Sequence, residues 1–385
     1  MKLAAICKRL MGKTPATART TMRLASMDER ITPTINVASI YGVGSGPGMD
    51  ATVKVYNNSG TLIDTFKPYP VGPTQSQFQG GVEIAIGDIN GDGVPDVITG
   101  AGPGGGPHVK VFDGVDVAAG STNPGVLRTY FAYDGTFMGG VHVAAGDING
   151  DGLIDIIVGA GPGGGPNVQA FSNGNLGTRL MSYFAYEPTF MGGVNVAAGD
   201  VGGDGTTDEI ITGAGPGGGS RVGVYNYLST IPVGLPQQKI ADFFAYDPTI
   251  PCGVTVASGF TTNNRDASNF LYADIITGAS VGGGPHLKVF RLLDARYDVL
   301  GNPADWSFFT AGQMFPYPAT FTGGIHVAVV RNGTADDILT VPGAGMAPDL
   351  RILNQTSIID MATYVPTQRF QQYPFPISDM DGINL

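Results

Sequence analysis

The sequence repeats itself at intervals of 54 to 65 residues. Each copy places a glycine-rich turn before a V-x-V-F/Y segment, and the matching residues are Gly44, Gly100, Gly159, Gly213, Gly278 and Val341. A copy holds four short apolar or aromatic segments of the kinds seen at 141–145, 156–158, 109–112 and 130–133, with no helical periodicity. Four strands per repeat with glycine-rich turns are typical of a propeller blade. The sequence therefore predicts an all-β propeller of six four-stranded blades.

The two ends of the repeat array predict how the ring closes. The first copy begins at its second strand, 35–40, and residues 381–385 align with the first-strand segment 80–84. A blade assembled from both chain ends leaves no free sheet edge that could pair with another molecule. We therefore expect N- and C-terminal strands to share one blade, and the protein to be a monomer.

Composition is compatible with a single folded domain over 34–385. The 60 Gly and 27 Pro accompany 42% hydrophobic residues, which is enough apolar material for a core. The formal net charge of -11 argues against nucleic acid as a partner, because phosphate binding needs clustered Lys and Arg. The two cysteines, Cys7 and Cys252, match no disulfide framework or zinc motif.

Residues 1–33 form a separate basic segment. Seven of the 21 basic residues lie within the first 30 positions. The apolar run 3–7 is too short for a secretory signal or a transmembrane segment. The stretch 23–33 resembles a short bacterial sorting segment, and a disordered tail is the alternative. We expect an extracellular or cell-surface location in a bacterium.

Three copies carry a nine-residue acidic loop, D-x-[N/G]-x-D-G-x-x-D, between their first and second strands. The loops contain Asp88, Asn90, Asp92 and Asp96, then Asp147, Asn149, Asp151 and Asp155, then Asp200, Asp204 and Asp208. Alternate oxygens around a glycine turn suit Ca2+, which takes about six to eight oxygen ligands. The same residues are also ordinary in solvated Asx turns. The shared register of three copies favours Ca2+ as a cofactor.

These features together resemble the FG-GAP repeats of integrin α-subunits and of many bacterial surface proteins. The resemblance lies in the V-x-V-F/Y strands, the G-A-G-P turns and the acidic loops, and it covers about 34–385. It implies a β-propeller. Because integrin propellers have seven blades, seven is the alternative to six.

The resemblance also implies a ligand set for each loop. Position 7, occupied by Val94 and Leu153 in the first two loops, would offer its backbone carbonyl. The third loop has Gly202 at position 3 and Thr206 at position 7, so we expect two well-formed calcium sites and a weaker third. Phe260 and Arg331 stand where the next two copies would need the first Asp, and those loops should not bind calcium.

Glycine-rich turns and aromatic runs recur at fixed positions. The turn 100–107 is not followed by Lys-Ser/Thr, so we do not expect it to bind phosphate. We expect its glycines to adopt positive φ angles and to let neighbouring blades approach closely. The aromatic runs 130–133, 183–186, 243–246 and 315–317 occupy one blade position. We expect packing between blades, with a sugar-stacking platform as the alternative.

All four histidines occupy repeat-equivalent positions. On the innermost strand, the predicted polar ring consists of Glu83, His142, Asn195, Thr255, His326 and Asn384. On the third strand, the equivalent positions are Thr52, His108, Asn167, Arg221, His286 and Asp349. Either ring could hold a ligand, although polar residues on the wet side of a strand are the ordinary explanation.

Two functions are compatible with these features. The first is a non-catalytic, calcium-binding scaffold that presents one face to a protein or glycan, as in adhesion. Near-identical turns throughout the chain favour it. The alternative is a propeller enzyme, a polysaccharide lyase or hydrolase, whose groups come from the divergent copies. Its candidate residues are Arg265, Asp266, Arg331 and Asp337.

Overall fold

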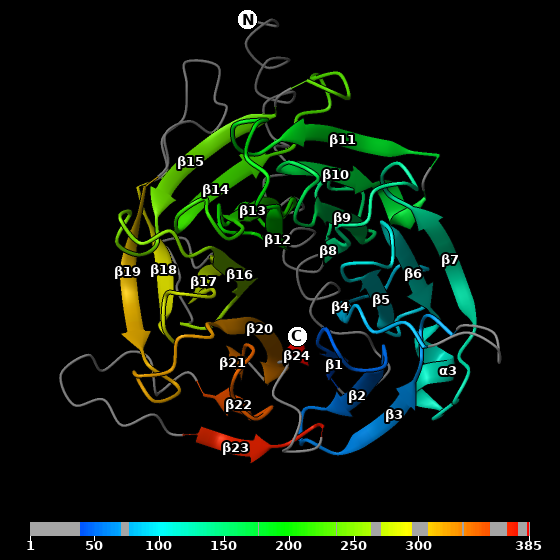
Figure 1. Ribbon diagram of the computed structural model, residues 1–385. Coiled ribbons are helices and arrows are strands. Elements are labelled where there is room, and N and C mark those ends of the chain that lie inside the picture. The colour runs from blue at the N-terminus through cyan, green and yellow to red at the C-terminus, as the bar shows by residue number, and fades with distance from the viewer. Residues whose placement is uncertain are drawn as a thin grey trace, which may run out of the picture. The chain divides into compact units, whose positions relative to one another are not determined.

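Six four-stranded antiparallel sheets surround a central channel (Figure 1). The computed structural model describes residues 39–70, 77–175, 177–235, 237–262, 271–294, 307–332, 335–354, 368–375 and 383–384. All belong to the larger of the two units into which the chain divides, Ala38–Leu385. The prediction of an all-β propeller with six blades, rather than seven, is confirmed. The predicted basic segment 1–33 and the candidate residues Arg265 and Asp266 lie outside the described residues.

The blades are numbered here in chain order, and each is given from its innermost to its outermost strand. Blade 1 consists of β24 (Ile383–Asn384), β1 (Ile40–Ser45), β2 (Val53–Asn57) and β3 (Leu62–Phe66). Blade 2 consists of β4 (Val82–Gly87), β5 (Asp96–Ala101), β6 (His108–Phe112) and β7 (Val126–Phe131). Blade 3 consists of β8 (Val141–Gly146), β9 (Asp155–Ala160), β10 (Asn167–Phe171) and β11 (Arg179–Phe184).

The second half of the ring repeats this order. Blade 4 consists of β12 (Val194–Gly199), β13 (Glu209–Ala214), β14 (Arg221–Asn226) and β15 (Gln238–Phe244). Blade 5 consists of β16 (Val254–Gly259), β17 (Asp274–Ala279), β18 (Leu287–Asp294) and β19 (Ser307–Met314). Blade 6 consists of β20 (Ile325–Asn332), β21 (Ala335–Pro342), β22 (Leu350–Leu353) and β23 (Gln368–Gln372). Two short helices, α3 (Gly114–Ala118) and η1 (Ser172–Gly174), follow β6 and β10.

The ring closes as the sequence predicts. The C-terminal strand β24 is the innermost strand of blade 1 and pairs with β1, with Asn384 opposite Gly44 and Ile383 opposite Ser45. The predicted start of this copy is too early, because β1 begins at Ile40 rather than at residue 35, and residues 35–38 lie outside the described part. Closure by both chain ends is confirmed.

The fourth strand lies earlier in each copy than predicted. In blade 2 it covers Val126–Phe131, and Ala132 and Tyr133 follow it. The chain turns there because Tyr133 reaches into blade 3, where its hydroxyl donates to the carbonyl oxygens of Val158 and Asn167, both at 2.8 Å. The aromatic run therefore combines the end of a strand with a contact between blades.

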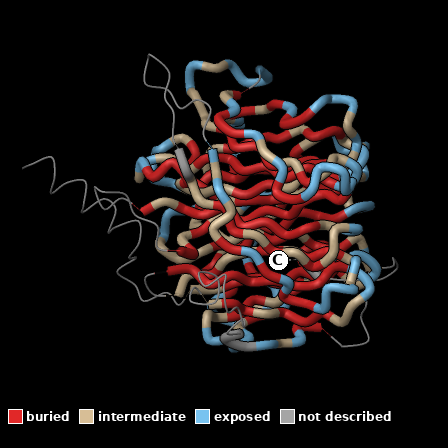
Figure 2. Tube along the Cα trace, turned by 90° about the vertical axis from the view of Figure 1, so that its left-hand side faces the viewer, coloured by how far each residue is buried: buried red, intermediate tan, exposed pale blue. Residues whose placement is uncertain are grey.

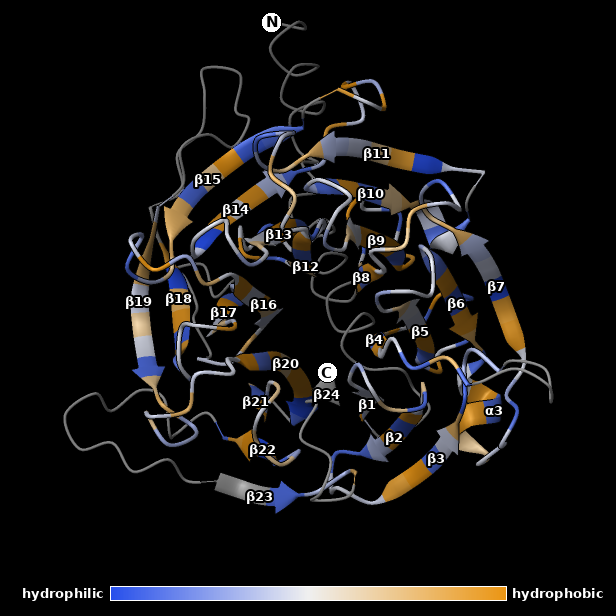
Figure 3. Cartoon of the chain, viewed as in Figure 1, coloured by the Kyte–Doolittle hydropathy of each residue, from blue (hydrophilic) through white to orange (hydrophobic). Residues whose placement is uncertain are grey.

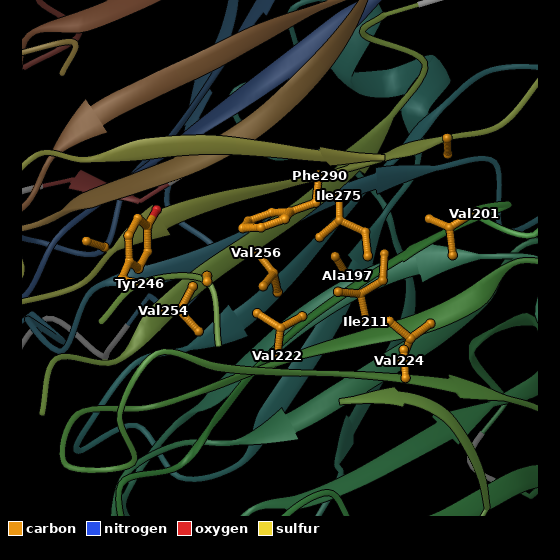
Figure 4. Packing of buried hydrophobic residues seen from close by; sticks show 14 of the residues in the cluster. Ala197, Val201, Ile211, Val222, Val224, Tyr246, Val254, Val256, Ile275 and Phe290 are labelled. Atoms are coloured by element: carbon orange, nitrogen blue, oxygen red, sulfur yellow. The ribbon is translucent and has the colours of Figure 1, made fainter. Parts of the chain in front are cut away.

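The core lies between blades. The second strand of blades 2 to 6 is buried along its whole length, because it is central in its sheet and both of its faces are covered by neighbouring blades. Between blades 4 and 5, Val222 and Val224 of β14 pack with Val254 and Val256 of β16 and with Phe290 (Figure 4). Buried residues follow the strands and exposed residues gather at their ends (Figure 2). Hydrophobic and hydrophilic residues are mixed along the outer strands (Figure 3).

A buried tyrosine links each of several blades to the next. The hydroxyls of Tyr69, Tyr186, Tyr246 and Tyr317 donate to the carbonyls of His108, Arg221, His286 and Asp349 at 2.7 to 3.0 Å, as Tyr133 does to Asn167. A third-strand cation stacks on the same ring in four of these pairs, namely Lys110 on Tyr69, Arg221 on Tyr186, Lys288 on Tyr246 and Arg351 on Tyr317. For these tyrosines, the expected packing between blades is confirmed.

The strand register defines two faces. In blade 2, Glu83 pairs with Gly100, Gly100 with Val109, and His108 with Phe131, so these residues lie at one end of the sheet. The glycine-rich turn 102–107 joins β5 to β6 at this end, and we call this side the turn face. The acidic loop 88–95 joins β4 to β5 at the opposite end, which we call the loop face.

Glycine in the turn 102–107 allows the turn to lie close to the neighbouring segment that contains Gly80. A Cβ on Gly102 would lie 2.0 Å from the carbonyl oxygen of Gly80. The N–H groups of Gly102, Gly104 and Gly105 are hydrogen-bonded to carbonyls of Gly81, Met138 and Gly102, at 2.8 to 3.1 Å. These donors are occupied by the protein itself, which agrees with a structural rather than a phosphate-binding turn.

Candidate functional site

A polar ring lies where the innermost strands reach the turn face. Its described members are Glu83, His142, Asn195, Thr255 and His326, one each from β4, β8, β12, β16 and β20. They pair with the residues Gly100, Gly159, Gly213, Gly278 and Val341, which mark the sequence repeat. The predicted inner ring is confirmed for these five positions. The side chain of Asn384 lies outside the described residues.

Two members of the ring hold neighbouring blades together. Asn195 Nδ2 donates to the carbonyl oxygen of Val254 at 2.8 Å, which links β12 to β16. Thr255 Oγ1 donates to the carbonyl oxygen of Ile325 at 2.9 Å, which links β16 to β20. These two side chains therefore have a structural role at the channel wall.

Glu83 and His142 form an ionic pair across blades 2 and 3. His142 Nδ1 lies 3.6 Å from Glu83 Oε2, and the two side chains are 26% and 19% exposed. Burial raises the pKa of Glu83, but the neighbouring His142 and His326 outweigh it, and the net result is a lowered pKa. Glu83 is therefore ionised at neutral pH. The sequence places Glu83 and His142 in the same ring, but it does not show which ring residues contact each other. Their pairing therefore could not be predicted.

His326 completes the cluster from blade 6. Burial lowers the pKa of its imidazole, the negative charge of Glu83 raises it, and His142 lowers it, with a lowered pKa as the net result. The imidazole of His326 is therefore uncharged at neutral pH and able to accept a proton. A carboxylate and two imidazoles of different environment are suited to general acid–base chemistry.

An apolar cavity adjoins this polar mouth. It has a volume of about 200 Å3 and is lined by innermost-strand residues, including Ile84, Ala85, Val143, Ala144, Val196 and Val327. These residues follow the ring positions along their strands, so the cavity continues from the mouth towards the loop face. A largely apolar cavity with a few convergent polar groups is the usual form of a small-molecule site. We refer to the cluster Glu83, His142 and His326 as the channel mouth.

The acidic loops of blades 2 and 3 share one conformation. In blade 2, Asp88 Oδ1 accepts from the N–H of Gly91 and Oδ2 from that of Gly93, both at 2.8 Å, and Asp92 Oδ1 accepts from Val94 at 2.8 Å. In blade 3, Asp147 and Asp151 make the corresponding bonds to Gly150, Gly152 and Leu153. Asn90 and Asn149 accept from the N–H groups of Asp92 and Asp151. These are the hydrogen bonds of Asx turns, which the sequence also allows.

The last acidic residue of these loops begins the second strand. Asp96 accepts from the N–H groups of Ile89 and Gly114 at 2.9 and 2.8 Å. Burial raises its pKa to about 6, the two N–H groups lower it, and the charges of Asp92 and Asp88 raise it further. Within the described part of the chain, no three His, Cys, Asp or Glu side chains are arranged to hold a metal ion. Calcium binding by these loops stays a prediction.

The third loop differs from the predicted alignment. Glu209, not Asp208, opens β13 and pairs with Gly199, as Asp96 pairs with Gly87 and Asp155 with Gly146. Glu209 Oε2 accepts from Gly202 N–H at 3.0 Å, the counterpart of the bond from Ile89 to Asp96. One extra residue in the loop displaces Asp208 from this place. The longer glutamate fills it instead, a substitution that the extra residue could have indicated.

In the divergent loops of blades 5 and 6, none of the described residues lies at the channel mouth. Phe260 directly follows β16, and its N–H donates to Asp336 Oδ2 at 2.8 Å. Arg331 Nη1 lies 3.3 Å from Asp336 Oδ1, and Asn332 Nδ2 donates to Asp337 Oδ2 at 2.9 Å. Arg331 and Asp337 thus stabilise the loop-face end of β20 and β21. Their predicted catalytic role stays a prediction, and both residues lie at the loop-face end of blade 6, away from the cluster at the turn face.

The described residues contain no helix long and apolar enough to span a bilayer. No family model matches the chain, and no curated protein matches it either. Among solved structures, rhamnogalacturonan lyase YesW matches with a TM-score of 0.37 and 11% identity, over 83% of this chain and 67% of that one. The exotype rhamnogalacturonan lyase YesX gives 0.38 and 12%, over 81% and 65%.

A rhamnogalacturonan lyase of Bacillus licheniformis gives a TM-score of 0.36 and 12% identity, over 88% of this chain and 80% of that one. This chain thus spans about two thirds of the length of the two lyases YesW and YesX. At these TM-scores the similarity assigns neither a substrate nor a residue to this chain.

The expectation of a non-catalytic adhesion scaffold is not supported, since the three similar structures are lyases and none of them is an integrin-like protein. That expectation rested on the uniformity of the turns. The turns are uniform because every blade must approach the next closely, whereas the polar ring on the innermost strands differs from blade to blade. FG-GAP membership has no support from a family model.

Proposed function

We propose that this protein is a propeller enzyme that performs acid–base chemistry on a carbohydrate at the channel mouth. The observation that carries the proposal is the Glu83–His142 pair, with Nδ1 and Oε2 3.6 Å apart, beside an apolar cavity of about 200 Å3. This keeps the enzyme alternative and moves its site from the divergent loops to the ring. Each group has a distinct role.

Glu83 orients His142 through the contact between Glu83 Oε2 and His142 Nδ1, as a carboxylate beside an imidazole does. His326, held neutral, serves as the base. In an elimination, His326 takes a proton from the carbon next to a sugar carboxylate. The C–O bond to the leaving sugar breaks, a C=C bond forms, and His142 donates the proton that the leaving oxygen needs.

Elimination fits the described mouth better than hydrolysis does. Glycoside hydrolysis ordinarily uses two carboxyl groups on either side of the scissile bond. Among the described ring residues Glu83 is the single carboxylate, and its four companions are two imidazoles, an amide and a hydroxyl. The proposed reaction class is therefore that of a polysaccharide lyase acting on a uronate unit.

The test is turnover of uronate-containing polysaccharides, followed by ultraviolet absorbance of unsaturated ends and by reducing ends. We expect both signals to rise together for the wild type. Glu83→Gln and His142→Gln should each lower kcat by about 10²- to 10⁴-fold, the usual contribution of a general acid or base. Glu187→Gln is the matched control, since Glu187 is an exposed carboxylate outside the channel.

Reducing ends without unsaturated ends would show hydrolysis in place of elimination. Full activity in Glu83→Gln and His142→Gln would place the chemistry elsewhere. If neither signal rises on any substrate of the panel, the enzyme proposal fails.

FG-GAP kinship, calcium as a cofactor and export from a bacterial cell remain parts of this proposal. They are supported by the repeated turn and loop pattern and by the basic segment 1–33. Cell fractionation of the native protein tests export. Calcium is tested separately in the Discussion.

A further inference from the structure

One position on the turn face is aromatic and half-exposed in five consecutive blades. It is the residue at or just after the end of the fourth strand, and its occupants are Phe131, Phe184, Phe244, Phe315 and Tyr373, between 46% and 53% exposed. Blade 1 has Lys67 there. The preceding residue is turned the other way, and Phe66, Tyr130, Tyr183 and Met314 are buried in the core. We call the five exposed aromatic residues the aromatic rim.

Packing accounts for one side of four of the five rim rings. Phe131, Phe184 and Phe244 lie over the last glycine of their turns, where a Cβ on Gly106, Gly165 or Gly219 would be 3.4 to 3.6 Å from the ring. Two rings also contact a third-strand histidine, with centroids 4.9 Å apart for Phe131 and His108 and 4.5 Å apart for Phe315 and His286. The rings are therefore held in place while part of their surface faces solvent.

Three of the rim residues pair, across the sheet, with a polar residue that begins the third strand. His108 pairs with Phe131, Asn167 with Phe184 and Arg221 with Phe244. An apolar ring beside a hydrogen-bonding group matches a sugar, whose C–H face stacks on aromatic rings and whose hydroxyl groups bond at the edge. The aromatic rim also lies on the same face as the channel mouth, because Glu83 and Phe131 occupy the same end of blade 2.

Charge decides which sugars fit. Two cations beside the rim are already paired, Lys67 with Asp50 at 2.8 Å and Arg221 with Asp242 at 2.6 Å. The turns between blades add exposed carboxylates, Asp134 and Asp247, whose pKa values are lowered by hydrogen bonds from Thr136 and Thr249. These groups repel a densely charged polyanion, and they leave uncharged sugar units as the complementary partner.

We propose that the aromatic rim is a docking surface for an extended polysaccharide, and that it binds uncharged pyranose units by stacking. This inference rests on the proposed function, because it makes the rim the surface that holds the polymer around the reacting unit at the channel mouth. The two are separable, since binding at the rim requires no proton transfer.

The test is affinity electrophoresis of the full-length protein in gels containing xyloglucan, galactan, hydroxyethylcellulose or polygalacturonate. We expect retardation by at least one of the three neutral polymers. Phe131→Ala and Phe184→Ala should each weaken that binding by about 2- to 10-fold, the usual contribution of one aromatic contact. Phe309→Ala is the matched control, because Phe309 is also partly exposed but lies within β19, away from the rim.

Two further variants separate binding from folding. Phe184→Leu keeps an apolar cover over Gly165 but removes the ring face, so it should lose binding while its melting temperature stays near that of the wild type. Phe184→Tyr should bind as the wild type does. Glu83→Gln should also bind as the wild type does while losing turnover, which distinguishes this proposal from the catalytic one.

The rim proposal is overturned if no polymer retards the protein, or if Phe131→Ala and Phe184→Ala bind neutral polymers as tightly as the wild type. Retardation by polygalacturonate alone, unaffected by the rim variants, would assign binding to another surface and would equally overturn it. Binding to a neutral polymer, with no turnover of any uronate-containing polysaccharide, would leave the rim proposal standing and would contradict the catalytic one.

Discussion

Asp208 Oδ2 accepts a hydrogen bond from the N–H of Asp147 at 2.9 Å, although the two residues belong to the loops of different blades. The N–H of Asp208 donates in turn to the carbonyl oxygen of Asp147, also at 2.9 Å. Asp336 and Phe260 make the same pair of bonds between blades 6 and 5, at 3.1 and 2.8 Å. The carboxylate at this position therefore holds one blade to the preceding one, on the loop face.

Replacing Asp208 with alanine should destabilise the fold by about 1 to 2 kcal/mol, because the partly buried N–H of Asp147 loses its side-chain acceptor. Urea unfolding checks this. Asp208→Asn keeps an oxygen acceptor and should cost clearly less. Equal losses in both variants would show that the charge, rather than the hydrogen bond, stabilises the contact.

Calcium should stabilise the protein through the loops of blades 2 and 3. An ion that binds only the folded state raises the melting temperature by mass action, so chelation with EDTA should lower it and added Ca2+ should restore it. Asp92→Ala and Asp151→Ala should each remove about one bound ion, measured by calorimetry, because each loses one loop carboxylate. An unchanged melting curve with EDTA and with Ca2+ would refute calcium binding.

Gly223 leaves room for a neighbouring tyrosine. The third strands of blades 1, 2, 5 and 6 have a lysine or arginine at this position, and Lys288, for example, donates to the carbonyl oxygen of Ala245 at 2.8 Å. In blade 4, Tyr225 reaches the equivalent carbonyl, that of Ala185, with its hydroxyl. A Cβ on Gly223 would lie 2.8 Å from Tyr225 Cε2 and 2.9 Å from Thr212 Oγ1.

Gly223→Ala should therefore destabilise the protein by about 1 to 3 kcal/mol, as overpacking of a core does. Thermal and urea unfolding measure this loss. In the double variant Gly223→Ala/Tyr225→Leu the ring is absent, so the alanine should cost less there than in the wild-type background. If Gly223→Ala is as stable as the wild type, the Tyr225 ring does not require the space left by the missing side chain of Gly223.

His108 should make stability depend on pH. Burial, and then the charge of Lys110, lower its pKa to about 4, from about 6.5 in the unfolded chain. Between these values the unfolded state binds more protons than the folded state, so stability falls as pH falls through this window. His108→Gln keeps a partner for Thr129 Oγ1 and should reduce the proton uptake on unfolding by up to about one proton.

The measurement is urea unfolding of both proteins in steps from about pH 7 to about pH 4. The stability of the wild type should fall more steeply over this range than that of His108→Gln. Parallel curves would show that His108 titrates alike in the folded and unfolded states.

Much of the fold could be predicted because blades repeat. The repeat-marking residues Gly100 and Gly159 pair with the innermost ring residues, and a Cβ on either would lie within 2.7 Å of a carbonyl oxygen in the next blade. Glycine at these positions is thus required by the approach of successive blades. The same repetition predicted closure through β24 and β1.

The site was predictable only as a ring of equivalent positions. The sequence places Glu83, His142 and His326 on innermost strands, but it does not say which side chains meet across blades. Likewise it groups Tyr130 with Phe131 in one aromatic run, whereas the structure buries the first and exposes the second.

The sequence by itself determined the number of blades, the order of the strands and the closure of the ring, because these follow from a local pattern repeated in register. Only the tertiary structure decided that Glu83 pairs with His142 and that five aromatic rings face solvent. Those outcomes depend on how successive blades pack against each other. That packing joins residues about 60 positions apart, beyond the reach of any local pattern.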